Sequence, residues 1–316
     1  MRVHTLTLNP AIDETITLDR LVPGQVHRAR GVRQNAGGKG INVASCLADW
    51  RTPVSAHGLL GRDNAAPFEA LFAAKPITDA MVRVDGATRV NLKLVDADDT
   101  TDINLDGLAV TDETLATVLD GLTAMAAPGD MVVLAGSLPP GCPPACYATL
   151  VARLRAQGVH VLLDASGDPL ARALAAPVLP QVIKPNRDEL AAWAGEALPD
   201  CTAVLAAARA LHARGVEQVV VSMGSQGALF VTGDGAVHAQ LALPPLGPLG
   251  VASTVGAGDA MVAGLAAAHV AGLGLAETAR LATAFAVAKL GMAGPNLPEK
   301  ASVMALAQDV IIGPRP

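Results

Sequence analysis

Short apolar runs alternate with longer segments rich in Ala and Leu over the last two thirds of the chain. Four of these runs predict buried strands, at 131–134, 159–163, 181–183 and 218–221, and the segment 143–156 predicts a helix between the first two. Strands and helices that alternate at this spacing are typical of a parallel sheet covered on both faces. Each predicted strand ends in a polar or glycine-rich loop, and ligands of such sheets bind beyond the carboxyl ends of the strands.

The first third of the chain follows a different pattern. In the segments 11–33 and 87–105, short strands with alternating apolar and polar residues are predicted, and Val26 is among their strand positions. Alternation indicates a sheet with one face in water. Since no linker or internal repeat divides the chain, we expect a single domain over 1–316. Within it, the two segments form a small β-sheet that acts as a lid or as a dimer surface.

Composition and charge exclude several classes of protein. Of the 316 residues, 51% are hydrophobic, but only 2% are aromatic and the net charge is −6. This balance argues against a nucleic-acid partner, which needs a basic surface or stacking aromatic rings. The four cysteines form no C-x-x-C pair and indicate reduced thiols. The run 260–276 is too short for a membrane helix and predicts a buried core helix, and the N-terminus is too short and polar for a signal peptide, so we expect a cytoplasmic protein without a membrane partner.

The segment Ser253–Ala260 places small residues and one carboxylate where a loop becomes a predicted helix. Glycines at a helix start allow close backbone approach to a ligand, and the free N–H groups there attract anions. A carboxylate at this position repels phosphate, but it can take a proton from a hydroxyl that attacks phosphorus. The segment therefore predicts phosphoryl transfer with Asp259 as the base. The alternative for Asp259 is a helix cap or a helix-dipole partner.

Two further motifs combine cations with small or polar residues. The segment Asn35–Ala44 places three glycines around Lys39 before a predicted helix, and its spacing differs from that of a Walker A loop. It predicts either a phosphate or sugar site or a simple turn. Arg89, Asn91 and Lys93 share one face of a predicted strand, because side chains repeat every two residues. That face suits a phosphate or a sugar, or it is an ordinary solvated face.

Two motifs lie near the predicted nucleotide side of the sheet. The segment Lys184–Glu189 follows a strand and opens a helix, and Asn186 with Glu189 resembles a capping box. The functional alternative places both side chains near a triphosphate and its Mg²⁺, which prefers oxygen ligands and keeps several waters. The segment Ser222–Gly227 lies between two predicted strands and indicates a hairpin-like turn, along which a nucleotide could lie.

Taken in order, these motifs resemble the ribokinase-like (PfkB) carbohydrate kinases over nearly the whole chain. The two signatures of that family are matched by 37–42 and 253–260. The segment Asn9–Asp13 and Lys39 are similar to the sugar-phosphate branch, because most relatives that act on unphosphorylated sugars have Asp where this chain has Lys39. A substrate that already bears a phosphate favours a cation there. Ser253 stands where many relatives have Asp, although related sugar-phosphate kinases share the Ser.

The resemblance implies a ribokinase-like α/β fold, with a mostly parallel central sheet, helices on both faces and a small β-sheet lid. It implies ATP-dependent phosphorylation of a sugar phosphate, with Mg²⁺, in a homodimer formed through the lid. Fructose 1-phosphate is the expected substrate and fructose 1,6-bisphosphate the product. Fructose 6-phosphate and tagatose 6-phosphate are alternative substrates, and a catalytically inactive sugar-phosphate sensor is the alternative of another class.

The resemblance also implies a role for each matching residue. The catalytic residues are the base Asp259 and the anion hole formed by the N–H groups of Gly256, Ala257 and Gly258. The substrate-binding residues are Asp13, Gly38 and Asn42 for hydroxyl groups, and Lys39, Arg89, Lys93 and the nearby Ser137 for the existing phosphate. The ATP-binding residues are Lys184, Asn186, Glu189, Ser222, Gly224, Gly227 and Thr254, with Glu189 ordering Mg²⁺ through water.

Overall fold

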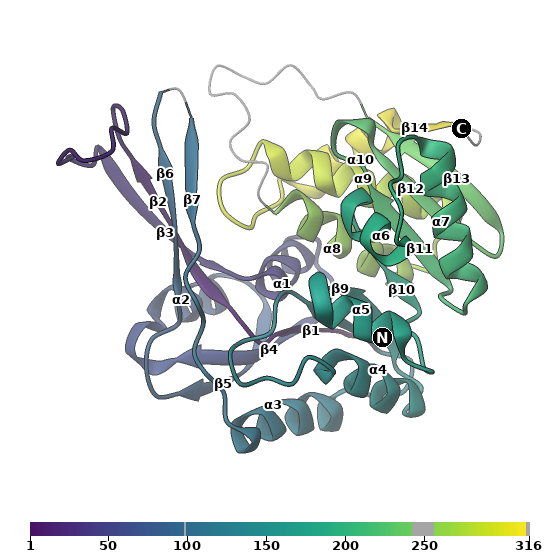
Figure 1. Cartoon of the computed structure of the whole chain (residues 1–316), viewed down its shortest axis with the longest axis horizontal. Helices are drawn as coiled ribbons and strands as arrows, with labels where there is room; N and C mark the ends of the chain where they lie inside the picture. Colours follow the sequence, from purple (N-terminus) through teal and green to yellow (C-terminus); the bar gives the residue numbers. More distant parts are fainter. Residues whose placement is uncertain (98, 242–255, 314–316) are drawn as a thin grey trace.

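The computed structural model describes residues 1–97, 99–241 and 256–313, and its centre is a ten-stranded sheet (Figure 1). In spatial order the strands are β14 (Ile311–Gly313), β13 (Gly235–Gln240), β12 (Ala228–Thr232), β11 (Gln218–Ser222), β10 (Val182–Ile183), β9 (His160–Asp164), β8 (Met131–Ala135), β1 (Val3–Thr7), β4 (Val54–Gly61) and β5 (Ile77–Val84). The strands from β5 to β11 are parallel, and β12, β13 and β14 are antiparallel. The predicted strands and the hairpin-like turn between β11 and β12 are confirmed.

Helices cover both faces of this sheet, as the alternating pattern predicts. The helices packed on one face are α1 (Lys39–Asp49), α2 (Ala66–Ala74), α8 (Ala257–Val270), α9 (Leu275–Leu290) and α10 (Lys300–Asp309). The helices packed on the other face are α3 (Asp112–Met125), α4 (Cys146–Ala156), α5 (Gly167–Ala175), α6 (Arg187–Ala194) and α7 (Cys201–Ala213). Two short 3₁₀ helices, η1 (Arg62–Asn64) and η2 (Gly224–Gln226), complete the elements of this layer structure.

The central strands are buried at nearly every position because each face of the sheet has its own core. In β11, Val220 packs into the core under α8 and α9, whereas Val219 and Val221 pack into the core under α6 and α7. Continuous apolar runs are typical of parallel sheets that are buried on both faces. This double burial fixes the carboxyl ends of the strands, from which the loops of the site emerge.

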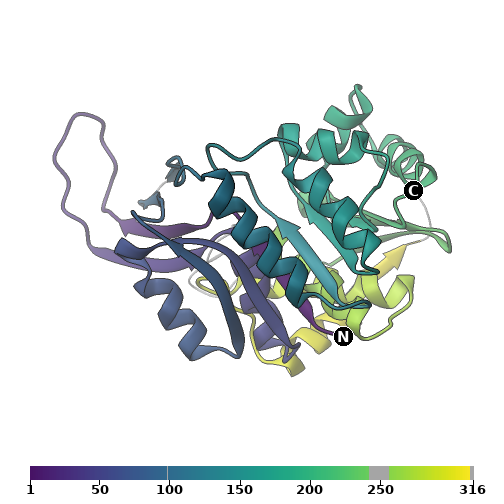
Figure 2. The same cartoon turned by 90° about the horizontal axis from the view of Figure 1, so that it is seen from below.

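The lid is a separate four-stranded sheet that projects from one end of the molecule (Figures 1 and 2). Its strands in order are β3 (Gly31–Gly37), β2 (Ala11–Thr17), β6 (Val90–Val95) and β7 (Thr100–Ile103). The small sheet expected from 11–33 and 87–105 is therefore present. The prediction of a strand at Val26 is wrong, because Val26 is 99% exposed in the loop between β2 and β3. One apolar residue without alternating neighbours is too weak a signal for a strand.

The apolar run 260–276 divides between two helices. Helix α8 ends at Val270, a turn at Gly272 follows, and α9 begins at Leu275. The prediction of one core helix is thus correct only up to Val270, because the glycines that follow end the helix. No helix in the described ranges has both the length and the apolar character needed to cross a bilayer.

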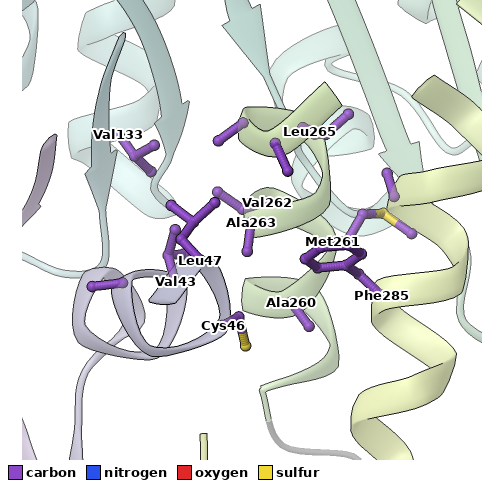
Figure 3. Close-up of a cluster of buried hydrophobic side chains, with 14 of the residues drawn as sticks. Val43, Cys46, Leu47, Val133, Ala260, Met261, Val262, Ala263, Leu265 and Phe285 are labelled. Carbon is purple, nitrogen blue, oxygen red and sulfur yellow. The ribbon is translucent and has the colours of Figure 1, made fainter. Parts of the chain in front are cut away.

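Small residues allow α8 and α9 to pack very closely (Figure 3). A Cβ atom at Gly264 of α8 would lie 2.6 Å from the Cα of Ala282 and 3.1 Å from the Cγ of Phe285, both in α9. Real Cβ atoms are essentially never found that close to backbone, so the contact requires glycine. In a chain with few aromatic residues, this close approach of helices replaces large side chains as a source of dense packing.

We expect Gly264→Ala to destabilise the protein, although alanine is the better helix former. Overpacking costs about 1–3 kcal/mol, which exceeds the gain of up to ~1 kcal/mol from helix propensity. The matched control is Gly121→Ala in α3, where nothing lies within 4 Å of the added Cβ and a small stabilisation is expected. Urea unfolding of both variants measures the difference. Similar stabilities for the two variants would contradict the close-packing argument.

Candidate active site

One carboxylate, that of Asp164, lies between two lysines at the carboxyl edge of the large sheet. Asp164 is the last residue of β9, and its Oδ1 is 3.3 Å from Nζ of Lys39 and 3.4 Å from Nζ of Lys184. Lys39 begins α1 and Lys184 follows β10, so three elements meet here. Asp164 is buried, and within the described residues its Oδ2 has no hydrogen-bond partner.

The carboxylate of Asp259 lies in the first turn of α8 and is 7% exposed. Its Oδ2 accepts a hydrogen bond of 2.8 Å from Nδ2 of Asn42 on α1. Burial and the negative charge of Asp164 raise the pKa of Asp259 to about 6, against the effects of the Asn42 hydrogen bond and of the charges of Lys39 and Lys184. A carboxyl group with this pKa is ionised at neutral pH and remains a usable proton acceptor.

The N-terminus of α8, which is predicted to form an anion hole, lies beside Asp259. Gly256 is the N-cap with φ of 85°, a conformation that favours glycine, and the helix begins at Ala257. The first N–H groups of a helix have no partner within it and suit an anion. A Cβ atom on Gly258 would be 3.6 Å from Nζ of Lys184, so the lysine lies beside this turn. Thr254, also predicted for this loop, lies outside the described residues.

A cavity of about 530 Å³ extends from the inner face of the lid to the N-terminus of α8. Its lining includes four predicted site residues: Asp13, Asn42, Lys93 and Gly256. Asp13 pairs with Asn91 across β2 and β6, and its Oδ1 accepts a hydrogen bond of 3.2 Å from Nδ2 of Asn91. Burial raises the pKa of Asp13, against the Asn91 hydrogen bond and the charge of Lys93. The cavity therefore combines an acceptor for hydroxyl groups with a cation.

The other predicted phosphate-binding residues make contacts elsewhere. The guanidinium group of Arg89 donates to backbone carbonyls of Asn9, Pro10 and Leu105 at 3.2, 3.3 and 3.0 Å, so in this structure it ties a lid strand to the loop after β1. Oγ of Ser137 accepts a hydrogen bond of 3.1 Å from Nδ2 of Asn9. Ser137 nevertheless follows Gly136, where an added Cβ atom would lie 3.7 Å from Cβ of Lys39.

Gly38 is required by packing as well as by its position in the loop. Its φ is 109°, and a Cβ atom there would lie 2.8 Å from Cγ2 of Thr7 and 3.0 Å from Cα of Pro10. A larger residue would push the start of α1 away from β1. Packing therefore requires glycine at this position, in addition to its predicted role toward sugar hydroxyls.

On the nucleotide side, the predicted capping box at α6 is present. Oδ1 of Asn186 accepts from the backbone N–H of Glu189, and Oε2 of Glu189 accepts from the backbone N–H of Asn186, both at 2.8 Å. A bridge between Asn186 and Ser222 joins this turn to the hairpin that holds Gly224 and Gly227. The predicted nucleotide residues outside Thr254 therefore lie on neighbouring loops.

The charge of Glu189 acts on Lys39, which also interacts with Asp164 and Asp259. Burial acts to lower the pKa of Lys39, but the charges of Asp164, Asp259 and Glu189 together raise it. Four charged groups from four elements therefore interact at one place. Within the described residues, no group of three or more Asp, Glu, His or Cys side chains forms a preformed metal cage. Mg²⁺ needs no such cage, because it keeps several waters and is held by one or two carboxylates and substrate phosphates.

Sequence reasoning missed three kinds of residue at the site. Asp164 was treated only as the end of a strand, although that position at a parallel-sheet edge is itself a signal. Arg33 and Asn35 line the cavity from β3, and Asn35 is paired with Asp13 across the lid. Arg33 and Asn35 are two residues apart on β3, so both side chains lie on the face of the lid that carries Asp13. This period of two is a signal that the sequence contains. Lys289 lines the same cavity from α9, and no local pattern marks it.

The sequence model of the pfkB family carbohydrate kinases matches residues 6–301. The chain belongs to this family. It is similar to the 1-phosphofructokinase of Xanthomonas campestris pv. campestris, at 53% identity over 100% of this chain and 99% of that protein. It is also similar to the 1-phosphofructokinase of Rhodobacter capsulatus, at 48% identity over 99% of this chain and 98% of that protein.

Among solved structures, the fold is similar to that of phosphofructokinase-2 from Escherichia coli in complex with fructose-6-phosphate. The TM-score is 0.87 at 27% identity, and the match covers 97% of this chain and 98% of that one. The likeness confirms the ribokinase-like fold that the sequence motifs imply. The family and fold together confirm that the chain is a carbohydrate kinase.

Proposed function

We propose that this chain transfers the γ-phosphoryl group of ATP to fructose 1-phosphate and forms fructose 1,6-bisphosphate and ADP. The observation that supports this most is the position of Asp259. Its carboxylate lies in the first turn of α8 and accepts a hydrogen bond from Asn42, and Asn42 and Gly256 line the cavity that also carries a cation, Lys93. Relatives at 53% and 48% identity that are named 1-phosphofructokinase favour the same substrate.

In the proposed reaction, the 6-hydroxyl oxygen attacks the γ-phosphorus and the bond to the bridging oxygen of ADP breaks. Asp259 takes the hydroxyl proton, and its pKa of about 6 suits that task at neutral pH. The N–H groups of Gly256, Ala257 and Gly258 face the negative charge of the transferring group. Phosphoryl transfer depends mainly on positioning and on such electrostatic stabilisation.

The sugar phosphate is proposed to lie along the cavity. With the acceptor hydroxyl at Asp259, the existing phosphate lies toward the lid, where Lys93 is found. Asp13 and Asn42 lie between and suit sugar hydroxyls, with Gly38 at the same loop. Arg89 and Ser137 are assigned to the phosphate end by resemblance, and Arg89 would have to leave its three carbonyl partners to bind it directly.

The nucleotide is proposed to lie along the loops of α6 and η2, with Lys184 facing its phosphates. Ser222, Gly224 and Gly227 are assigned to this side, together with Thr254, which lies outside the described residues. Mg²⁺ fits the residues present, because Asp164 has an oxygen without a partner in the described chain and Glu189 offers a second carboxylate that acts through water. When bound, Mg²⁺ neutralises charge on the β- and γ-phosphates.

The outer face of the lid supports the proposed homodimer. Ile16 is paired with Val32 and Leu94, and Leu92 is paired with Ile103, so one face of the small sheet is mostly apolar. Val32 and Ile103 are exposed in the single chain. An exposed apolar patch of this kind marks an interaction surface. A chain that sediments as a monomer at micromolar concentration would refute this assignment.

The proposed function is tested by measuring ADP release with three substrates. We expect kcat/KM for fructose 1-phosphate to exceed that for fructose 6-phosphate and tagatose 6-phosphate, since the relatives at 53% and 48% identity are named 1-phosphofructokinase. A preference for either of the other two would keep the reaction type and change the substrate. Absence of turnover with all three would favour a sugar-phosphate sensor.

We expect Asp259→Asn to make the protein slower and more stable at once. The rate constant kcat should fall by about 10²–10⁴ with little change in KM. The folded-state pKa of Asp259 is raised, so its ionised form costs stability above about pH 6, on the order of 3 kcal/mol at most. Asparagine removes that cost and can still accept from Asn42.

Urea unfolding at pH 7.5 and pH 5 checks the stability of the Asp259→Asn variant against the wild type. The stabilisation should be largest at pH 7.5 and shrink toward pH 5, because the wild-type carboxyl becomes protonated as the pH falls through about 6. Near-normal kcat would remove Asp259 from the role of base. Unchanged stability would instead contradict the raised pKa.

Lys39 is tested against its neighbour Lys184, which contacts the same oxygen of Asp164. If Lys39 binds the phosphate of the sugar, Lys39→Ala should raise KM for fructose 1-phosphate about tenfold or more and affect KM for ATP much less. Lys184→Ala should show the reverse pattern. Equal effects of Lys39→Ala on both KM values would assign Lys39 to the transferring phosphate instead.

A further inference from the structure

Lys289 is a buried lysine that lines the proposed substrate cavity, and among the described residues no carboxylate forms a salt bridge with it. It lies in the last turn of α9, is only 3% exposed, and lines the cavity together with Asn42 and Gly256. Within the described residues, the one acceptor of its Nζ is the backbone carbonyl of Met292 at 3.0 Å. Burying an ammonium group without a paired carboxylate is costly, so its presence here needs an explanation.

The surroundings of Lys289 offer partial compensation. The C-terminal end of α9 carries negative partial charge, which favours a cation. Cys46 lies nearby, but burial raises the pKa of its thiol to about 12, so it is not a counter-ion at neutral pH. Asp259 attracts the ammonium group and Lys93 repels it, while the Asp259 carboxylate accepts a hydrogen bond from Asn42. An ordinary lysine at a helix end extends into solvent, whereas this one is enclosed beside the anion hole.

The position of Lys289 relative to the anion hole is the central observation. A Cβ atom on Gly256 would lie 3.4 Å from Cε of Lys289, so the lysine stem packs against the residue that caps α8. The N-terminus of α8 carries positive partial charge, and an ammonium group close to it is repelled. An anion bound between the ammonium group and the N-terminus of α8, or beside both, would offset this repulsion. The cavity that they share is open to such an anion.

We propose that Lys289 is a catalytic residue that binds the phosphoryl group during transfer and then holds it as the new phosphate of the product. The inference rests on the proposed function. The acceptor hydroxyl lies at Asp259, so the group that arrives beside Gly256 is the transferred phosphoryl group. The existing phosphate of the sugar is proposed to lie toward the lid, near Lys93, which lines the same cavity from β6. Lys289 stays protonated and donates to a non-bridging oxygen, and it adds no covalent step.

The test compares binding of the monophosphate substrate with binding of the bisphosphate product, without nucleotide. Lys289→Met removes the charge and keeps a flexible apolar stem of similar length. By isothermal titration, it should weaken fructose 1,6-bisphosphate about 10- to 100-fold, as expected for a hydrogen bond between charged groups. Fructose 1-phosphate should bind within about threefold of wild type, while kcat falls by a factor similar to that for the bisphosphate.

Lys93→Met is the matched control, because Lys93 is a second cation that lines the same cavity, from the lid strand β6. It should weaken both ligands by similar factors. If Lys289→Met also weakens both equally, Lys289 holds the existing phosphate or only supports the fold, and the proposal is overturned. Unchanged affinity for both ligands overturns it as well. Should the Met variant fail to fold, as judged by circular dichroism, Lys289→Gln replaces it in the same comparison.

The two proposals fail in different ways. If wild-type protein does not phosphorylate fructose 1-phosphate, the proposed function is wrong whatever the variants do. If wild-type protein turns over normally and the ratio of product to substrate affinity is the same in Lys289→Met, only the role of Lys289 is wrong. A restored ratio in Lys289→Arg, which keeps the charge, would support the electrostatic role over a packing role.

Discussion

The site depends on one shared interaction, in which a single buried oxygen of Asp164 faces the ammonium groups of Lys39 and Lys184. Like charges repel strongly where water is excluded, so the two lysines can lie together only because this carboxylate lies between them. The same carboxylate raises the pKa of Asp259. One side chain at the end of β9 thus gathers the cations that phosphates need and tunes the carboxyl group that removes a proton.

The fold keeps these charges in place by burying the sheet on both faces. The strands that carry Asp164 and Lys184 lie between two apolar cores, and neither strand can shift without disturbing both. On the helical side, α1 and α8 pack against each other, so Asn42 and Asp259 meet although 217 positions separate them in sequence. The large sheet and its helices therefore hold Asp259 and Asn42 together, and the small sheet contributes Asp13 and Lys93 to the cavity.

Much of the fold could be predicted from the sequence because local patterns determine it. Apolar runs over 131–134 and 218–221 mark strands buried on both faces, and the Asn186 capping box marks the start of α6. The exposed Val26 was assigned to a strand in error, because one apolar residue carries too little pattern. The single helix expected over 260–276 failed for the opposite reason, since apolar composition continues through a glycine turn that ends the helix.

The site was predictable in its parts and not in its connections. Glycine-rich loops at strand ends identified Asp259 and Lys39, because such loops have chemistry that is visible locally. That Lys39 contacts Asp164, that Arg89 is held by three carbonyl groups, and that Lys289 reaches the cavity all depend on tertiary contacts across distant segments. Spacing along the chain does not encode these contacts.

One of the connections between the lid and the main body, from β3 to α1, is one residue long. Strand β3 ends at Gly37 and α1 begins at Lys39, so only Gly38, with φ of 109°, lies between them. A tilt of β3 is therefore transmitted through one backbone unit to Lys39, the residue that bears the ammonium group. In any protein with this connection, the lid strand β3 and the charge of Lys39 move together, and an insertion at Gly38 would uncouple them.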